Sequence, residues 1–255
     1  MGTADLHIHT ALGDGMAEIP ELLDYVQQQT ELGVIAITEH DDLRAAFAAR
    51  EAWARGNYRY DFIVGEEVTT IAGHVVALFI EEPVASLKAL APTLEAIHKL
   101  GGLAIVPHPM SWLTRSLGQR TIERVLRAEG VPREQQDGVY FDAIELSGSL
   151  AARVSAKKVQ RLNRERYHLP EIGGSDAHFP ETIGTSHTRF EGRTAQELRA
   201  AILAGKTAAE MSPYPSLRQI GVRRIVRQQW RGMMATPRQM GWLPTIASFV
   251  KRALP

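Results

Sequence analysis

Side chains that could bind a metal ion stand close together near the start of the chain, in the segment Asp-Leu-His-Ile-His at residues 5–9. Alternate side chains of a β-strand point to opposite faces, so Asp5, His7 and His9 would share one face. Two imidazoles side by side at a strand end are a ready pair of metal ligands, although two surface histidines would give the same pattern. The rest of the sequence must decide between these readings.

Ligand-type side chains recur where other apolar, strand-length segments end, and five of the nine histidines stand at such positions. The carboxyl ends of parallel strands in a barrel meet on one face, so these side chains are expected to meet there. We expect one of Asp41 and Asp42 to cap the following helix, and only one of Glu66 and Glu67 to face the site. The candidate metal ligands are His7, His9, Asp14, His40, one of Glu66 and Glu67, His108, Asp176 and His178.

Strands and helices alternate along the chain, which predicts a mainly parallel sheet covered by helices, either closed as a barrel or open and doubly wound. The segments 62–69 and 74–80, joined by a turn, predict an antiparallel intrusion. Further strands are predicted at 4–8, 34–38, 103–106, 143–146 and 171–174, and helices at 20–32, 43–55, 86–99, 119–129, 151–167 and 194–204.

Composition narrows the chemistry. The chain has 255 residues, of which 44% are hydrophobic and 23% charged, as is ordinary for a globular protein with a substantial core. Cysteine is absent, which excludes disulfides, thiolate metal sites and cysteine nucleophiles. Any metal must therefore be held by histidine and carboxylate. No apolar run has the length of a membrane-spanning helix and no signal sequence is seen, so we expect a cytoplasmic protein.

Charge divides the chain into an acidic body and a basic extension. Residues 212–255 contain eight arginines or lysines and no acidic residue, so residues 1–211, with an overall charge of zero for the chain, carry a formal charge of minus eight. We predict a catalytic domain at 1–211 and a helical extension at 212–255, with helices near 220–230 and 242–254. The extension could pack on the body, lie on an anionic membrane surface, or contact a protein; stable nucleic-acid binding is not expected.

Six of these motifs, taken in order, resemble the PHP (polymerase and histidinol phosphatase) superfamily of metal-dependent phosphoesterases. They are Asp-Leu-His7-Ile-His9-Thr, Gly-Asp14-Gly, Thr-Glu-His40-Asp, Gly-Glu-Glu67-Val, Pro-His108-Pro and Gly-Ser-Asp176-Ala-His178. The resemblance implies a distorted (β/α)7 barrel with two or three divalent ions, manganese, zinc or iron, at the carboxyl ends of the strands.

The resemblance also assigns the ligands of each ion. One ion would be held by His7, His9, Glu67 and Asp176, with Glu67, chosen over Glu66 by its distance from Gly65, bridging to a second ion that His108 also holds. A third would be held by Asp14, His40 and His178. Many members place a further histidine near the strand at 143–146, where this chain has Glu145, Ser147 and Ser149, which leaves the second ion's coordination incomplete.

The expected activity is hydrolysis of a small phosphomonoester, such as a nucleotide, a sugar phosphate or a compound like histidinol phosphate, through a metal-bridged hydroxide. Alternatives are a small-molecule phosphodiesterase, an amidohydrolase-like metal hydrolase, and a non-catalytic metal-binding or scaffolding module. His178 or His74 could protonate the leaving oxygen, Asp5 and Glu145 could orient imidazoles from behind, and Arg115 and Arg189 could contact the substrate.

Overall fold

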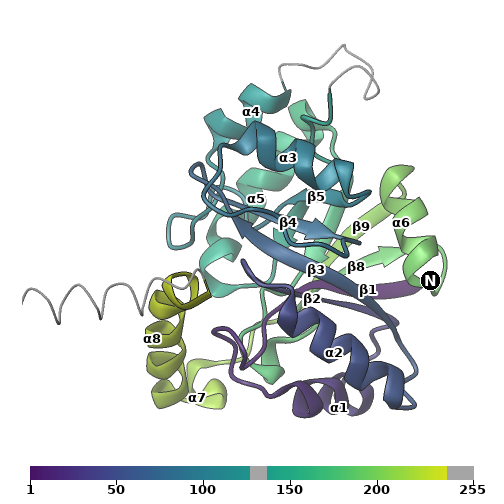
Figure 1. Cartoon of the computed structure of the whole chain (residues 1–255), viewed down its shortest axis with the longest axis vertical. Helices are drawn as coiled ribbons and strands as arrows, with labels where there is room; N and C mark the ends of the chain where they lie inside the picture. Colours follow the sequence, from purple (N-terminus) through teal and green to yellow (C-terminus); the bar gives the residue numbers. More distant parts are fainter. Residues whose placement is uncertain (127–136, 240–255) are drawn as a thin grey trace, which may run out of the picture.

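The computed structural model describes residues 1–126 and 137–239 and shows one mixed sheet with helices packed around it (Figure 1). The strand order is β7-β6-β5-β4-β3-β2-β1-β8-β9. The strands are β1 Gly2–Ile8, β2 Val34–His40, β3 Asp61–Thr69, β4 His74–Leu78, β5 Leu103–Val106, β6 Ala143–Ser147, β7 Glu171–Gly174, β8 Ser186–Phe190 and β9 Thr207–Met211. The α-helices are α1 Ile19–Gln29, α2 Arg44–Arg55, α3 Leu90–Lys99, α4 Gln119–Leu126, α5 Leu150–Leu162, α6 Ala195–Leu203, α7 Leu217–Ile220 and α8 Val222–Gln239.

Strands β1 to β7 curl into a nearly closed barrel. The segment after β7 returns to β1, where the Ala177 N–H donates to His7 O at 3.1 Å and the His9 N–H donates to Ala177 O at 2.9 Å. Within β1 to β7, neighbouring strands are parallel except β4, which is antiparallel to both β3 and β5; β8 is antiparallel to β1 and β9. This arrangement confirms the predicted distorted barrel and its antiparallel intrusion, and it places the start of β4 beside the ends of its neighbours.

Buried strands position the site because both faces of the sheet are covered. In β2, Val34 and Ala36 pack in one apolar cluster, whereas Ile35 and Ile37 pack in another with residues of α1 and α2. All four side chains are fully buried. A strand that is buried on both faces has a continuous apolar sequence, as β2 does. Packing on both faces also holds the end of the strand rigidly.

Several element boundaries differ from those expected. Strand β9 was not predicted because Thr207-Ala-Ala-Glu-Met has few β-branched or aromatic residues; its pairing with β8 creates it. Strand β8 lies between β1 and β9 and is therefore not an edge of the sheet. The helix expected to run through residue 167 ends at Leu162 and is followed by a π-turn. The predicted segments 127–129 and 242–254 lie outside the described residues.

The described part of the basic extension packs against the acidic body. Arg224 of α8 pairs with Glu181, with Nη2 3.2 Å from Oε2. The Arg231 guanidinium donates to Ala11 O and to Gly13 O, in the loop that follows β1. Contact of other arginines of the extension with a membrane surface or another protein stays a prediction. Within the described residues, no helix is both long enough and apolar enough to cross a membrane.

Candidate metal centre

The predicted ligands converge at the carboxyl-terminal end of the barrel. His7 and Glu67 belong to β1 and β3, His40 ends β2, and the remaining ligands follow the ends of β1, β5 and β7. His74 joins them because β4 runs antiparallel and therefore begins at this end. The side chains brought together are His7, His9, Asp14, His40, Glu67, His74, His108, Asp176 and His178.

One group of potential ligands consists of His7, His9, Glu67 and Asp176, whose ligand atoms all lie within 4.8 Å of one another. His7 Nε2 is 3.1 Å from Glu67 Oε2 and 3.7 Å from Asp176 Oδ1. His9 Nε2 is 3.4 Å and 3.5 Å from the same two oxygens. Two nitrogens and two carboxylate oxygens therefore face a common point, an arrangement suited to a divalent ion.

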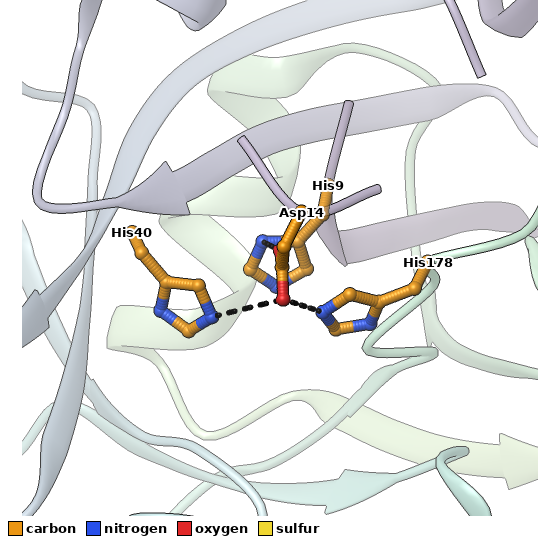
Figure 2. A group of neighbouring side chains, drawn as sticks. All are labelled: His9, Asp14, His40 and His178. Atoms are coloured by element: carbon orange, nitrogen blue, oxygen red, sulfur yellow. Dashed lines mark ion pairs between the residues drawn. The ribbon is translucent and has the colours of Figure 1, made fainter. Parts of the chain in front are cut away.

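A second group consists of His9, Asp14, His40 and His178, again with ligand atoms within 4.8 Å of one another (Figure 2). Asp14 lies between two imidazoles, with Oδ2 3.1 Å from His178 Nε2 and 3.9 Å from His40 Nε2. The rings of His9 and His178 stack with centroids 4.2 Å apart. This group contains the three residues expected to hold a third ion, together with His9.

Glu67 is the shared centre of the cluster. Its Oε1 lies 2.7 Å from His74 Nδ1 and 2.8 Å from His108 Nε2, while its Oε2 lies 3.2 Å from His40 Nδ1. His40, Glu67 and His74 form a further group of potential ligands. His74 therefore stands beside the second ion's expected ligands, where the family pattern left the coordination incomplete.

The neighbouring Glu66 faces away from the cluster. Its side chain is also buried, but Oε2 accepts from the Val84 N–H at 3.0 Å. The alternation of β3 thus sends one of two adjacent glutamates to the metal ligands and the other to the outer layer. The N-cap residue of α2 is Leu43, not one of the two aspartates, but the preceding Asp42 accepts from the Arg44 N–H at 2.8 Å. Asp41 accepts from the Thr69 N–H at 2.7 Å.

Two buried glutamates hold the histidines of the first motif from behind. Glu145 lies 3.2 Å from His7 Nδ1 and accepts from the His108 N–H at 2.9 Å. Glu39 lies 3.2 Å from His9 Nδ1 and accepts from the Thr10 N–H at 3.0 Å. Such contacts fix the ring tautomer and leave Nε2 free for a metal. Sequence reasoning named Glu145 but missed Glu39, because its partners follow a different strand.

Asp5 has a different role from the one expected. Its carboxylate does not orient an imidazole; it accepts from the N–H groups of His7, Ser175 and Gly184 at 3.3, 2.9 and 2.7 Å. These backbone donors belong to β1 and to the loops after β7, where ladder partners are interrupted. Burial raises the pKa of Asp5 to about 6, against the lowering effect of these hydrogen bonds.

Backbone geometry at two ligands is unusual. His108 has φ 30° and Asp176 has φ 53°, a left-handed region that non-glycine residues rarely enter. Such strain persists only where the surroundings enforce it, and it is concentrated at functional sites. Close packing also requires glycine at 174, since a Cβ there would lie 2.9 Å from the His7 Cβ and would collide with Glu145 Oε1.

The cluster strongly favours positive charge. Burial alone would lower the pKa of His7, but Glu145, Glu67 and Asp176 raise that pKa well above its ordinary value. Conversely, burial alone would raise the pKa of Glu67, yet the surrounding imidazoles lower that pKa well below its ordinary value. Within residues 1–126 and 137–239, no lysine or arginine forms an ion pair with Asp14, Glu39, Glu67, Glu145 or Asp176. Cations from solution are the natural counter-charge.

Unpartnered atoms show that metal ions fit this centre. His9 Nε2, Asp14 Oδ1, His40 Nδ1 and His74 Nε2 are buried and make no hydrogen bond of suitable geometry, although Glu67 Oε2 lies 3.4 Å from His9 Nε2 and 3.2 Å from His40 Nδ1. Buried polar groups are nearly always hydrogen-bonded, so four exceptions within one cluster need a cause. Coordination to ions at the carboxylates would satisfy these atoms, and imidazole with carboxylate suits manganese, zinc or iron.

Within the described residues, neither of the two arginines predicted to bind substrate has a guanidinium contact with the metal ligands. Arg189 lies opposite Thr3, at the beginning of β1, and pairs with Glu210 at 3.0 Å. Since the ligands lie at the other end of β1, this position does not support the predicted role. Arg115 is exposed, and its backbone carbonyl, not its guanidinium, contacts His74 N.

Helix α8 contributes a contact that the sequence did not reveal. Gln228 is buried, and its Nε2 donates to Asp14 Oδ2 at 3.3 Å. At Gly232, an added Cβ would lie 3.1 Å from the same oxygen. The extension therefore covers the Asp14 side of the centre, from more than 200 residues away in the sequence.

Comparisons with known proteins agree with the family resemblance of the sequence motifs. A family model described as PHP-associated matches residues 160–207. An uncharacterized protein of Methanocaldococcus jannaschii is 33% identical over 132 residues, which cover 47% of this chain and 75% of that protein.

Other similarities cover different shares of each chain. The 5′-3′ exoribonuclease Rnm of Salmonella typhimurium is 37% identical over 81 residues, but the match covers 30% of this chain and only 27% of the nuclease. A solved two-domain protein of Bacteroides vulgatus, described as containing a predicted PHP-like metal-dependent phosphoesterase, superposes with a TM-score of 0.62 at 22% identity. That superposition covers 82% of this chain and 64% of the other, and it shows a shared fold.

Proposed function

The chain belongs to the PHP superfamily of metal-dependent phosphoesterases, and from this premise we propose that it hydrolyses a small phosphomonoester. The observation that supports the proposal is the cluster of imidazoles and carboxylates around Glu67 at one end of the barrel. Several buried nitrogen and oxygen atoms of this cluster make no hydrogen bond of suitable geometry. Nucleotides, sugar phosphates and compounds like histidinol phosphate are the candidate substrates.

Divalent ions bound here would stabilise negative charge developing on phosphoryl oxygens and make a bound water acidic enough to attack phosphorus. His7, His9, Glu67 and Asp176 would hold one ion. Glu67, with His108 and His74, would hold a second. The protein itself needs no nucleophilic side chain.

The remaining task of the chain is to protonate the leaving oxygen. Two histidines were candidates, and His178 is the better placed because it lines a cavity beside the ligands, whereas His74 Nδ1 is held by Glu67. Burial alone would lower the pKa of His178, but Asp14 raises that pKa above its ordinary value, which favours the protonated form. With ions bound only around Glu67, His178 stays free to donate; with a third ion at Asp14, it becomes a ligand.

A phosphodiesterase of the same mechanism is the second candidate. It is favoured by the similarity to Rnm, whose name describes an exoribonuclease, although that similarity is restricted to 81 residues. Diester hydrolysis uses the same ligand set and differs in the group bound beside the phosphate.

The test is phosphate release by the full chain after chelation and re-addition of manganese, zinc or ferrous ion. The substrates are AMP, glycerol phosphate and p-nitrophenyl phosphate, with bis-p-nitrophenyl phosphate as the diester. We expect metal-dependent turnover of monoesters and its loss in Asp176→Asn. Turnover of the diester alone would favour the second candidate. Turnover that persists in chelator, or hydrolysis of amides and lactones instead, would overturn the proposal.

A further inference from the structure

A cavity of about 540 Å³ opens beside the metal centre. Asp176 and His178 belong to its lining, so a phosphate placed on the metal ligands would project its alcohol part into this space. The other walls come from the loop after β5, the start of α5, and α7 and α8. Its volume lies within the usual range for small-molecule sites.

The walls of the cavity are mostly aliphatic and aromatic. Trp112 and Leu113 form one side, Leu150 and Val154 a second, and Leu217 of α7 belongs to the lining as well. Several of these side chains are also open to solvent: Trp112 is 78% exposed and Val154 75%. Large apolar side chains gathered at a cavity mouth mark a ligand or partner site, because covering them removes apolar surface from water.

Among the described residues that line this cavity, only His178 can carry a positive charge. Among the described residues, none of those lining it is a lysine or an arginine. Arg153 stacks on the lining residue Tyr214, but its guanidinium donates to Gly148 O, Thr185 O and Ser212 O. Arg224 stacks over Phe179 and is held by Glu181. Apart from His178, no lining side chain could therefore form a salt bridge with a second phosphate or an oligonucleotide chain.

We propose that this cavity binds the alcohol part of the substrate and that this part is uncharged and apolar, an alkyl chain or an aromatic ring. The proposal rests on the proposed phosphoester hydrolysis for the position of the phosphate. It selects, among phosphoesters, those whose alcohol is apolar over sugar phosphates and polyphosphorylated nucleotides. The polar groups of Ser149, Thr114 and Gln229 in the lining could serve a single ester or hydroxyl oxygen.

The test separates binding from turnover. Alkylphosphonates with two to eight carbons, which cannot be hydrolysed at the phosphorus–carbon bond, are titrated calorimetrically into the full chain loaded with manganese. Burial of each methylene is worth about a fourfold gain in affinity, so the affinity should rise by about that factor for each carbon added to the alkyl chain. In Leu150→Asn, the affinity should rise less with each added carbon than in the wild type. Leu203→Asn, which replaces an exposed leucine of α6 outside the cavity, should leave it unchanged. Leu113→Asn, in the loop after β5, should likewise reduce the gain in affinity per carbon.

The outcomes distinguish this inference from the proposed function. Affinity that rises with chain length supports the apolar cavity, even if no phosphoester is turned over. Alkyl phosphates turned over at a rate independent of chain length, with a flat phosphonate series, would overturn the inference and leave the function standing. Tighter binding of glycerol phosphate than of butylphosphonate would overturn it as well.

Discussion

The pair of adjacent glutamates on β3 offers a direct experiment. Glu67 lies within 3.4 Å of five imidazole nitrogens, and Glu66, equally buried, touches none of these. We predict that Glu67→Gln abolishes tight metal binding, whereas Glu66→Gln leaves it intact. The two substitutions make the same chemical change one residue apart, on opposite faces of one strand.

The magnitude follows from the lost charge. Unit charges about 4 Å apart interact by roughly 4 kcal/mol at an effective dielectric constant near 20, so a dication and a carboxylate interact by about 8 kcal/mol. If lost hydration offsets about half of this, removal of the charge costs about 4 kcal/mol, or about a thousandfold in the dissociation constant. The substitution Glu66→Gln should change the metal dissociation constant less than about twofold. Burial raises the pKa of Glu66 to about 8, so at pH 7 a neutral amide replaces a neutral acid.

Calorimetric titration of manganese into the chelated protein at pH 7 measures both variants, and circular dichroism during heating checks that each is folded. Equal affinity of Glu67→Gln and wild type would refute the assignment of Glu67 as the shared ligand. An equal loss in both variants would show that the effect comes from general destabilisation.

Three further predictions concern the groups around these ligands. Burial raises the pKa of Glu66 from 4.5 to about 8, so the free energy of unfolding of the wild type should fall as pH rises through this interval. Because the introduced amide does not titrate, the free energy of unfolding of Glu66→Gln should increase relative to that of the wild type by up to about 5 kcal/mol between pH 4.5 and pH 8, as measured by urea unfolding. A constant difference between the two across pH 5 to 8 would contradict this. Glu145→Gln keeps an acceptor for the His108 N–H but loses the charge facing His7, and should weaken manganese binding 10- to 100-fold, whereas Leu203→Asn, at an exposed position outside the site, should not. Gln228→Ala should lower the affinity for the metal ion at Asp14 about three- to tenfold, which a stepwise titration would show as a change in one binding step. An equal change in all binding steps would refute a local role of Gln228.

Much of the barrel could be predicted because its strands are short apolar runs separated by helical periods. The alternation around His7 and His9, and its echo at Asp176 and His178, also locates the ends of β1 and β7. These are local patterns, since each spans three residues at or just after the end of one strand. Their convergence followed from the rule that parallel strands end on one face.

The remaining features depend on contacts between distant segments. Glu39 supports His9, and Gln228 reaches Asp14 from α8, without any local signal in the sequence. Asp5 looked like an imidazole partner because it shares the strand face, but it satisfies backbone donors after β7. Strand β9 has a weak intrinsic preference for extended structure and exists because β8 offers it an edge.

The most direct test of the account is phosphate release from p-nitrophenyl phosphate while manganese is titrated into the chelated full chain. We predict no release without metal, and release that rises in step with metal bound at the centre and is lost in Glu67→Gln. Release that is independent of metal, or full metal occupancy of the centre with no release from any phosphoester, would contradict it.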